Sequence, residues 1–163
     1  MNDTILSRRS FVAAAGLSGA ALLLFGRSGS AAGAGFAVSH TAAQWRQMLG
    51  AQRYAVLREA ATERAYSSAL LNEHRRGTFV CAGCGLPLFS SATKFESGTG
   101  WPSFWKPLPH SVVTRADRSL LMERTEVLCA RCGAHLGHVF DDGPKPTGLR
   151  YCMNGLALNF RPA

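Results

Sequence analysis

The chain carries five cysteines, and their spacing divides them into two groups. Four of them form two CxxC pairs, Cys81 with Cys84 and Cys129 with Cys132, and a glycine directly follows each pair. The fifth, Cys152, has no cysteine near it in the sequence and lies two residues after Arg150. Paired cysteines at this spacing are typical of metal ligands, whereas a single thiol near a cation is a candidate for reactivity.

The two CxxC pairs predict a structural Zn²⁺ site with four thiolate ligands, Cys81, Cys84, Cys129 and Cys132. Each CxxC-Gly segment forms a tight turn that brings two sulfurs together, and two such turns complete a tetrahedral site. Between the two pairs lie 44 residues, so the metal would join distant parts of the domain. Two CxxC disulfides and a thioredoxin-like redox motif are the alternatives. The first would close very small loops and stabilise little, and the second lacks its βαβ context.

The other residues suited to chemistry lie in three segments. These are "FESGTGWPSF" at 95–104, "GAHLGHVFDDGP" at 133–144 and "PTGLRYCMNGLALNF" at 146–160. Together with the CxxC pairs, they resemble the methionine sulfoxide reductase B family, whose members act on the R-diastereomer at sulfur. The resemblance covers about residues 40–161. It implies reduction of methionine sulfoxide in peptides or proteins, within a domain that holds a structural zinc ion.

In this family's reaction Cys152 would be the nucleophile. A sulfoxide sulfur is electrophilic, so a thiolate can attack it if the oxygen is protonated. On a strand, residues i and i+2 share a face, so the guanidinium of Arg150 would favour the Cys152 thiolate, and Asn154 would orient the site. A buried, inert thiol is the alternative reading of Cys152.

The resemblance assigns supporting roles to four further residues. His138 and Asp142 would bind or protonate the sulfoxide oxygen, because an aspartate can hold an imidazole in the correct tautomer. His135 would complete the polar side of the site, and Trp101 would pack against the S-methyl group of the substrate. In the simpler alternative Trp101 is a core residue, the histidines bind backbone in a loop, and Asp142 begins a turn.

Two positions depart from the family pattern. Thr99 stands where many members carry a second cysteine, so a sulfenic acid on Cys152 would have to be reduced by an external thiol or a thioredoxin-like partner. Gly155 stands where the family often has serine, which implies a small change in the polarity of the site.

Two functions compete with an enzyme: a zinc-stabilised binding module without catalysis, and a zinc-ribbon nucleic-acid binder. Cys152 favours an enzyme over a binding module.

Helical patterns occupy the beginning of the domain, over residues 41–66. Thr41 and Gln44 fit a capping box, and Gly50 divides the pattern, with a second piece over residues 52–61. We expect the buried face of these helices to carry the apolar side chains of Trp45, Met48, Leu49, Tyr54, Val56 and Leu57.

The rest of the domain shows short runs of β-branched and aromatic residues between turn-forming residues. The candidate strands are residues 77–81, 93–96, 110–117, 119–129, 150–154 and 157–161, with a hairpin turn at Asp117-Arg118. The sequence therefore predicts an α+β fold, mainly antiparallel β, with short N-terminal helices followed by two small antiparallel sheets.

Residues 1–37 predict a twin-arginine-type signal peptide, which leaves residues 38–163 as the reductase-like domain. Arg8 and Arg9 are followed by Ser-Phe, and the apolar run at 12–25 is short for a membrane helix. Ala32-Gly33-Ala34 is a candidate cleavage region. We expect export of the folded protein to the periplasm, with an uncleaved signal that anchors the chain to the membrane as the alternative.

The charge of the chain gives no sign of a nucleic-acid partner. Removal of residues 1–37, which contain three arginines and one aspartate, lowers the net charge from +8 to +6. The charged residues alternate in sign without a dense basic run, which favours an ordinary solvated surface. We expect a monomer that contacts a membrane only during export.

Overall fold

The computed structural model describes residues 35–119 and 123–163. Apart from its last three residues, the predicted signal peptide lies outside this part of the chain, so its boundary stays a prediction. Across the two described ranges, no helix has the length and apolar character needed to span a membrane.

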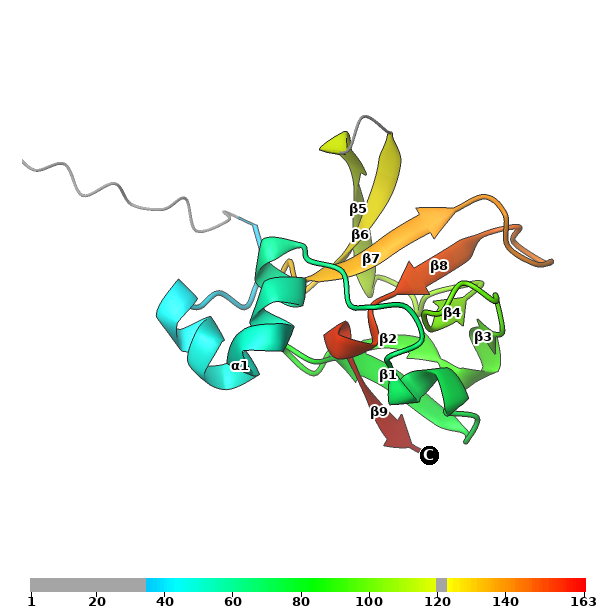
Figure 1. The fold of residues 1–163 in the computed structure, drawn as a ribbon, viewed down its shortest axis with the longest axis horizontal. Helices are drawn as coiled ribbons and strands as arrows, with labels where there is room; N and C mark the ends of the chain where they lie inside the picture. Colours follow the sequence, from blue (N-terminus) through cyan, green and yellow to red (C-terminus); the bar gives the residue numbers. More distant parts are fainter. Residues whose placement is uncertain (1–34, 120–122) are drawn as a thin grey trace, which may run out of the picture. The chain divides into compact units, whose positions relative to one another are not determined.

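Helix α1, Ala42–Glu59, begins with the predicted capping box (Figure 1). The Thr41 amide donates to Gln44 Oε1 at 2.9 Å, and the Gln44 amide donates to Thr41 Oγ1 at 3.3 Å. Gly50 has a φ of 69° and interrupts the helical backbone where the sequence indicates a break. The buried face carries Trp45, Tyr54, Val56 and Leu57, whereas Met48, expected on that face, is 56% exposed.

The prediction that the helical region reaches residue 66 is wrong. The helix ends at Glu59, because Ala60 takes a left-handed conformation with a φ of 55°. The chain then runs without helix to a short 3-10 turn at Ala69–Asn72. This non-helical segment supplies Thr62 and Glu63 to the site described below.

Three strands form the smaller sheet, in the order β2-β1-β9. They are β1 (Gly77–Cys81), β2 (Pro87–Ser90) and β9 (Leu158–Pro162). The sequence predicts β1 with its observed bounds and β9 within one residue at each end, but it misses β2.

Six strands form the larger sheet, in the order β3-β4-β8-β7-β6-β5. They are β3 (Lys94–Phe95), β4 (Ser103–Phe104), β5 (Val112–Asp117), β6 (Arg124–Cys129), β7 (His135–Phe140) and β8 (Arg150–Met153). Neighbouring strands in both sheets pair antiparallel, and the predicted α+β class is confirmed. The sequence misses β4 and β7. The expected two-residue turn at Asp117-Arg118 is wrong, because Asp117 pairs with Arg124.

Three phenylalanine rings of the buried core connect the two sheets. Phe89 and Phe104 stack with ring centroids 4.4 Å apart, and Phe79 meets Phe104 edge-on at 4.9 Å. These rings join β1 and β2 of the smaller sheet to β4 of the larger one, and all three are fully buried. Met153 on β8 is also buried in this core, which leaves the neighbouring Cys152 on the opposite face of the sheet.

Candidate active site and metal site

Cys152 occupies a central position in the larger sheet. On β8 it lies opposite Ser103 of β4 on one side and opposite His138 of β7 on the other. Directly paired residues of antiparallel strands project from the same face, so the thiol, the hydroxyl and the imidazole form a row. The row continues to Glu126 on β6 and Arg115 on β5, which are paired in the same register.

A pocket of about 140 Å³ opens on this face and contains the half-buried Cys152. It brings together four of the predicted site residues, Trp101, His138, Cys152 and Asn154. The other residues that line it are Thr62, Arg124, Gly137 and Phe140. The pocket therefore joins a thiol and an imidazole with aromatic walls, a combination that suits a small, partly apolar ligand.

The segment with His135 and His138 is a strand with a bulge, not the loop that the sequence indicates. His135 pairs with Leu128 and Gly137 pairs with Val127, so Leu136 is an extra residue in β7. Without this bulge, two residues three apart on a strand would face opposite sides of the sheet. With it, the two imidazoles lie on the same face with centroids 5.5 Å apart.

His138 is bonded to Asp117 and not to Asp142. Its Nε2 lies 2.8 Å from Asp117 Oδ2, so the expected pairing of His138 with Asp142 is wrong. Asp117 Oδ2 also accepts from Arg124 Nη2 at 2.7 Å, and Oδ1 accepts from the Ser119 amide at 2.9 Å. Hydrogen bonds from Ser119, followed by the one from His138, hold the pKa of Asp117 far below its ordinary value.

Asp142 instead binds the guanidinium of Arg150 with two hydrogen bonds. Arg150 Nε and Nη2 lie 2.8 Å from Asp142 Oδ1 and Oδ2, a bidentate geometry that fixes the orientation of the guanidinium. This pairing lowers the pKa of Asp142 and raises that of Arg150. The guanidinium also lies over the Phe140 ring, 4.4 Å from its centroid. Arg150 shares a face with Cys152, as the i, i+2 spacing predicts.

His135 is buried, with 4% of its surface exposed. Its Nδ1 is 2.6 Å from Glu126 Oε1, and Glu126 Oε2 in turn accepts from Arg115 Nε. Burial lowers the pKa of His135. Within the described residues, its Nε2 has no hydrogen-bond partner. His135 does not line the pocket and contacts the site through the ring of His138.

Glu63 holds Trp101 and Asn154 in place, although nothing in its sequence context indicates this role. Its carbonyl accepts from Trp101 Nε1 at 3.2 Å, and its amide donates to Asn154 Oδ1 at 3.0 Å. The Glu63 carboxylate accepts from the amides of Gly155 and Leu156, the second at 3.0 Å. One buried residue thereby connects the aromatic wall of the pocket to the segment that follows Cys152.

Hydroxyl groups occupy the side of Cys152 where the family often has a second cysteine. Thr99 Oγ1 lies 3.7 Å from Cys152 Sγ. Ser97 Oγ is 2.8 Å from Thr99 Oγ1 and 2.7 Å from Ser103 Oγ. These contacts place Thr99 next to the thiol, as the family resemblance of the sequence implies for that position.

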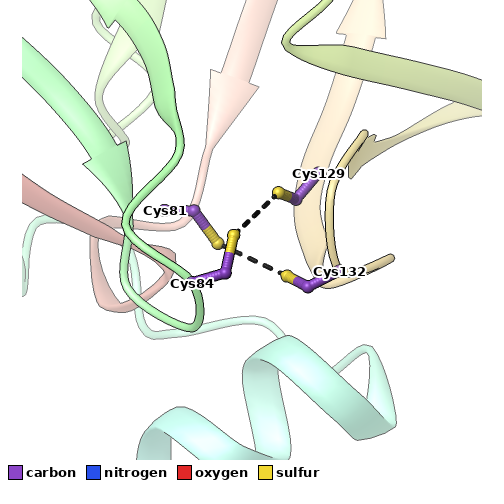
Figure 2. Close-up of side chains that lie close together, drawn as sticks. All are labelled: Cys81, Cys84, Cys129 and Cys132. Atoms are coloured by element: carbon purple, nitrogen blue, oxygen red, sulfur yellow. Dashed lines mark hydrogen bonds between the residues drawn. The ribbon is translucent and has the colours of Figure 1, made fainter. Parts of the chain in front are cut away.

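The four cysteines of the CxxC pairs converge from two turns, one after β1 and one between β6 and β7 (Figure 2). All four sulfurs lie within 4.8 Å of one another. Two of these contacts join the two pairs: Cys81 Sγ is 3.7 Å from Cys132 Sγ, and Cys84 Sγ is 3.5 Å from Cys129 Sγ. All four are free thiols, so the alternative of a disulfide within each CxxC pair does not fit.

The donor set of this cluster fits a soft metal ion. Hydrogen bonds with the other thiols, first of all with Cys129, raise the pKa of Cys81. Metal binding deprotonates cysteine ligands, so a bound cation would hold all four sulfurs as thiolates. Four sulfur ligands around one point are the arrangement that a tetrahedral metal site requires.

Known proteins share sequence similarity with this chain across the residues of both sites. The chain matches the model of the SelR domain over residues 49–162. It is 51% identical over 127 residues to the peptide methionine sulfoxide reductase MsrB of Leptospira interrogans, a match that spans 77% of this chain and 97% of the relative. It is 59% identical over 120 residues to the MsrB of Bradyrhizobium diazoefficiens, spanning 73% of this chain and 86% of the relative.

The similarity extends to an archaeal relative. The MsrB of Methanosarcina barkeri is 51% identical over 126 residues, which span 77% of this chain and 89% of that protein. The matched residues include both CxxC pairs, the pocket and Cys152. The chain belongs to the SelR domain family.

Proposed function

We propose that this protein reduces the R-diastereomer of methionine sulfoxide in peptides or proteins, with Cys152 as the nucleophile. The observation that carries the proposal is the half-buried thiol of Cys152, which shares a small pocket with the imidazole of His138 and the indole of Trp101. The matched relatives are peptide methionine sulfoxide reductases, which supports this activity for the present chain.

The reaction begins when the Cys152 thiolate attacks the sulfoxide sulfur. His138 donates a proton to the sulfoxide oxygen, and Trp101 and Phe140 supply apolar surface for the S-methyl group. The oxygen passes formally to Cys152, so the net products are methionine and a Cys152 sulfenic acid. The substrate sulfur gains two electrons and the sulfur of Cys152 loses two.

Arg150 and Asn154 both support the thiol. Arg150 lies on β8, the strand that carries Cys152, and Asn154 is the residue that follows this strand. The guanidinium of Arg150, fixed by Asp142, places positive charge on the face of the sheet that carries Cys152. The side chain of Asn154, bonded to the Glu63 amide, fixes the backbone that follows Cys152. Asp142 therefore acts through Arg150, and His135 acts by packing against His138.

Recycling of the enzyme requires an external thiol. The position beside Cys152 is occupied by the Thr99 hydroxyl, and the remaining four cysteines belong to the cluster. A thiol or thioredoxin-like partner would condense with the sulfenic acid and release water. A second thiol would then free Cys152 and carry away the disulfide.

We assign a structural Zn²⁺ ion to Cys81, Cys84, Cys129 and Cys132. When bound, a zinc ion with four thiolate ligands stabilises the fold and has no open position for substrate. The two turns that supply the ligands are separated by 44 intervening residues and follow β1 and β6, so the ion would join the two sheets.

Export by the twin-arginine route is a separate part of the proposal and rests on Arg8, Arg9 and the apolar run that follows them. Replacement of both arginines with lysines should leave the protein in the cytoplasm, as measured by cell fractionation. Unchanged export of the double variant would rule out this route.

The activity is tested with separated R- and S-sulfoxide diastereomers of one methionine-containing peptide, with dithiothreitol as the reductant. The parent protein should reduce the R form, with the S form as the matched control. Replacement Cys152→Ser should lower the rate by roughly 10³-fold or more, because the nucleophile is removed. Equal rates on both diastereomers, or an active Ser variant, would contradict the proposal.

A further inference from the structure

Asp117 at the end of β5 holds the histidine that faces the substrate pocket, and nothing in its sequence context marks it as part of the site. It lies on the β5–β6 hairpin, two strands away from β7. Its Oδ2 accepts from both His138 Nε2 at 2.8 Å and Arg124 Nη2 at 2.7 Å. Asp142, the aspartate that the sequence favours for this task, is occupied by Arg150.

The bond to Asp117 determines which nitrogen of His138 carries hydrogen. Asp117 is ionised, because hydrogen bonds from Ser119 and His138 keep its pKa far below the ordinary value. A carboxylate only accepts hydrogen bonds, so His138 Nε2 must be the donor. In the neutral imidazole, Nδ1 then holds the lone pair.

The strand order determines which side of the ring is left for substrate. Strand β7 lies between β8, which carries Cys152, and β6, beyond which lies β5 with Asp117. The Nε2 bond therefore points away from the side of the ring that adjoins Cys152. Among the described residues, His138 Nδ1 makes no hydrogen bond, so it is the nitrogen left for a ligand in the pocket.

We infer that Asp117 is a positioning residue, which fixes the orientation and tautomer of His138 so that Nδ1 delivers the proton to the sulfoxide oxygen. This inference rests on the proposed function. As the Cys152 sulfur attacks, the proton moves from Nδ1 of the imidazolium to the oxygen. The neutral ring then keeps its Nε2 hydrogen, bonded to Asp117. Arg124 serves to hold the carboxylate in place.

Several other charged or titratable groups surround His138. Arg124 and Glu126 come from β6, His135 from β7, and Arg150 and Cys152 from β8. Glu126 is bonded to His135 and Arg115, and Arg150 is bonded to Asp142. Among the described residues, none of these neighbours forms a hydrogen bond with the His138 ring, whereas Asp117 does.

The test compares Asp117→Asn with the parent in two measurements. The substitution keeps the size of the side chain but removes its charge. We expect kcat on the R-sulfoxide peptide to fall about 10- to 100-fold, while KM changes less than about threefold, because proton delivery and not binding is impaired. The ¹⁵N NMR signals of labelled histidines should show the Nε2–H tautomer of His138 in the parent, and its loss in the variant.

Glu123→Gln is the matched control on the same hairpin. Glu123 is exposed and pairs only loosely with Arg118, at 3.9 Å, so its substitution should leave kcat and the His138 signals unchanged. Asp117→Glu, which restores the charge, should recover part of the lost kcat.

Three outcomes would overturn the inference. The first is an Nδ1–H tautomer of His138 in the parent, which is decisive even if Asp117→Asn does not fold. The second is a folded Asp117→Asn variant with kcat within about twofold of the parent. The third is a parent that does not reduce R-sulfoxide at all, which would also remove the proposed function, whereas the first two leave that function intact.

Discussion

The four clustered cysteines and Cys152 are chemically identical side chains in contrasting surroundings. In the cluster, each sulfur faces three others within 4.8 Å, and three of the four residues are buried. Cys152 is half-buried in an open pocket, and its sulfur faces the Thr99 hydroxyl at 3.7 Å. The convergence of thiols on one point creates a cation site, whereas a thiol alone beside an imidazole and a guanidinium stays available for reaction.

The largest expected effect comes from making the same substitution in each environment. Cys129→Ser removes a buried ligand and should lower the free energy of unfolding by on the order of 3 kcal/mol or more, a fall of roughly 10 °C in Tm. Cys152→Ser should leave Tm within about 2 °C of the parent while it abolishes activity. Thermal unfolding followed by circular dichroism, with metal content measured on the same samples, checks both expectations.

A chelator strong enough to remove zinc should reproduce the effect of Cys129→Ser in the parent. If the parent keeps its Tm after complete removal of metal, or if Cys152→Ser proves the more destabilising variant, the contrast between the two environments does not hold.

The second prediction concerns a variant, Thr99→Cys, in which Cys152 gains a cysteine partner. Thr99→Cys places a second sulfur near the position of Thr99 Oγ1, 3.7 Å from Cys152 Sγ, from which a small side-chain rotation reaches bonding distance. After one turnover the variant should contain an internal disulfide between residues 99 and 152. Mass spectrometry of the alkylated, digested protein detects this bond.

Thr114→Cys is the control for this variant, because Thr114 is exposed on β5 and distant from Cys152 in the sheet order. It should form no internal disulfide with Cys152. Absence of the bond in Thr99→Cys as well would mean that Thr99 is not placed to act as the second position of the site.

The smallest expected effect is a loss of stability on substitution of Gly155, three residues after Cys152. A Cβ at this position would collide with the Cβ and Oγ of Ser68, so Ser68 fills the space that a serine side chain would take. Gly155→Ser should therefore cost about 1–3 kcal/mol of stability through overpacking. The double variant Ser68→Gly/Gly155→Ser should regain most of this loss in urea unfolding. Equal stability of the single and double variants would show that the two side chains do not compete.

The features that the sequence predicts well are local in the chain. The capping box at Thr41 and Gln44, the break at Gly50 and the turns of the CxxC pairs each depend on a few neighbouring residues. The strand β1 is also predicted with its bounds, since its pattern is clear. The shared face of Arg150 and Cys152 follows from strand periodicity alone.

The features that the sequence misses depend on strand register. The partner of His138 is Asp117, 21 residues away, and it comes into reach only because Asp117 pairs with Arg124 and Glu126 pairs with His138. Asp142 is closer in the sequence, but β7 ends at Phe140, and the carboxylate of Asp142 meets Arg150 instead. The bulge at Leu136 brings the two histidines to one face, and the only local signal for it is Gly137, the residue that follows.

Glu63 illustrates a second limit of sequence reasoning. A helical pattern through residue 66 would place this residue on α1, yet α1 ends at Glu59 and Glu63 contacts Trp101 and Asn154 from a non-helical segment. These tertiary hydrogen bonds outweigh the helical preference of the segment. The sequence thus indicates several residues that line the pocket, whereas it does not indicate Glu63 and Asp117, which hold Trp101, Asn154 and His138.

A single turnover without reductant tests most directly the claim that Cys152 is a nucleophile that cannot recycle itself. The protein is mixed with excess R-sulfoxide peptide, and both the methionine formed and the mass of the peptide with Cys152 are measured. We predict one methionine per chain and a Cys152 sulfenic acid, trapped by dimedone, while the four clustered cysteines stay unmodified. Continued turnover, or an internal disulfide between Cys152 and a cluster cysteine, would contradict this account.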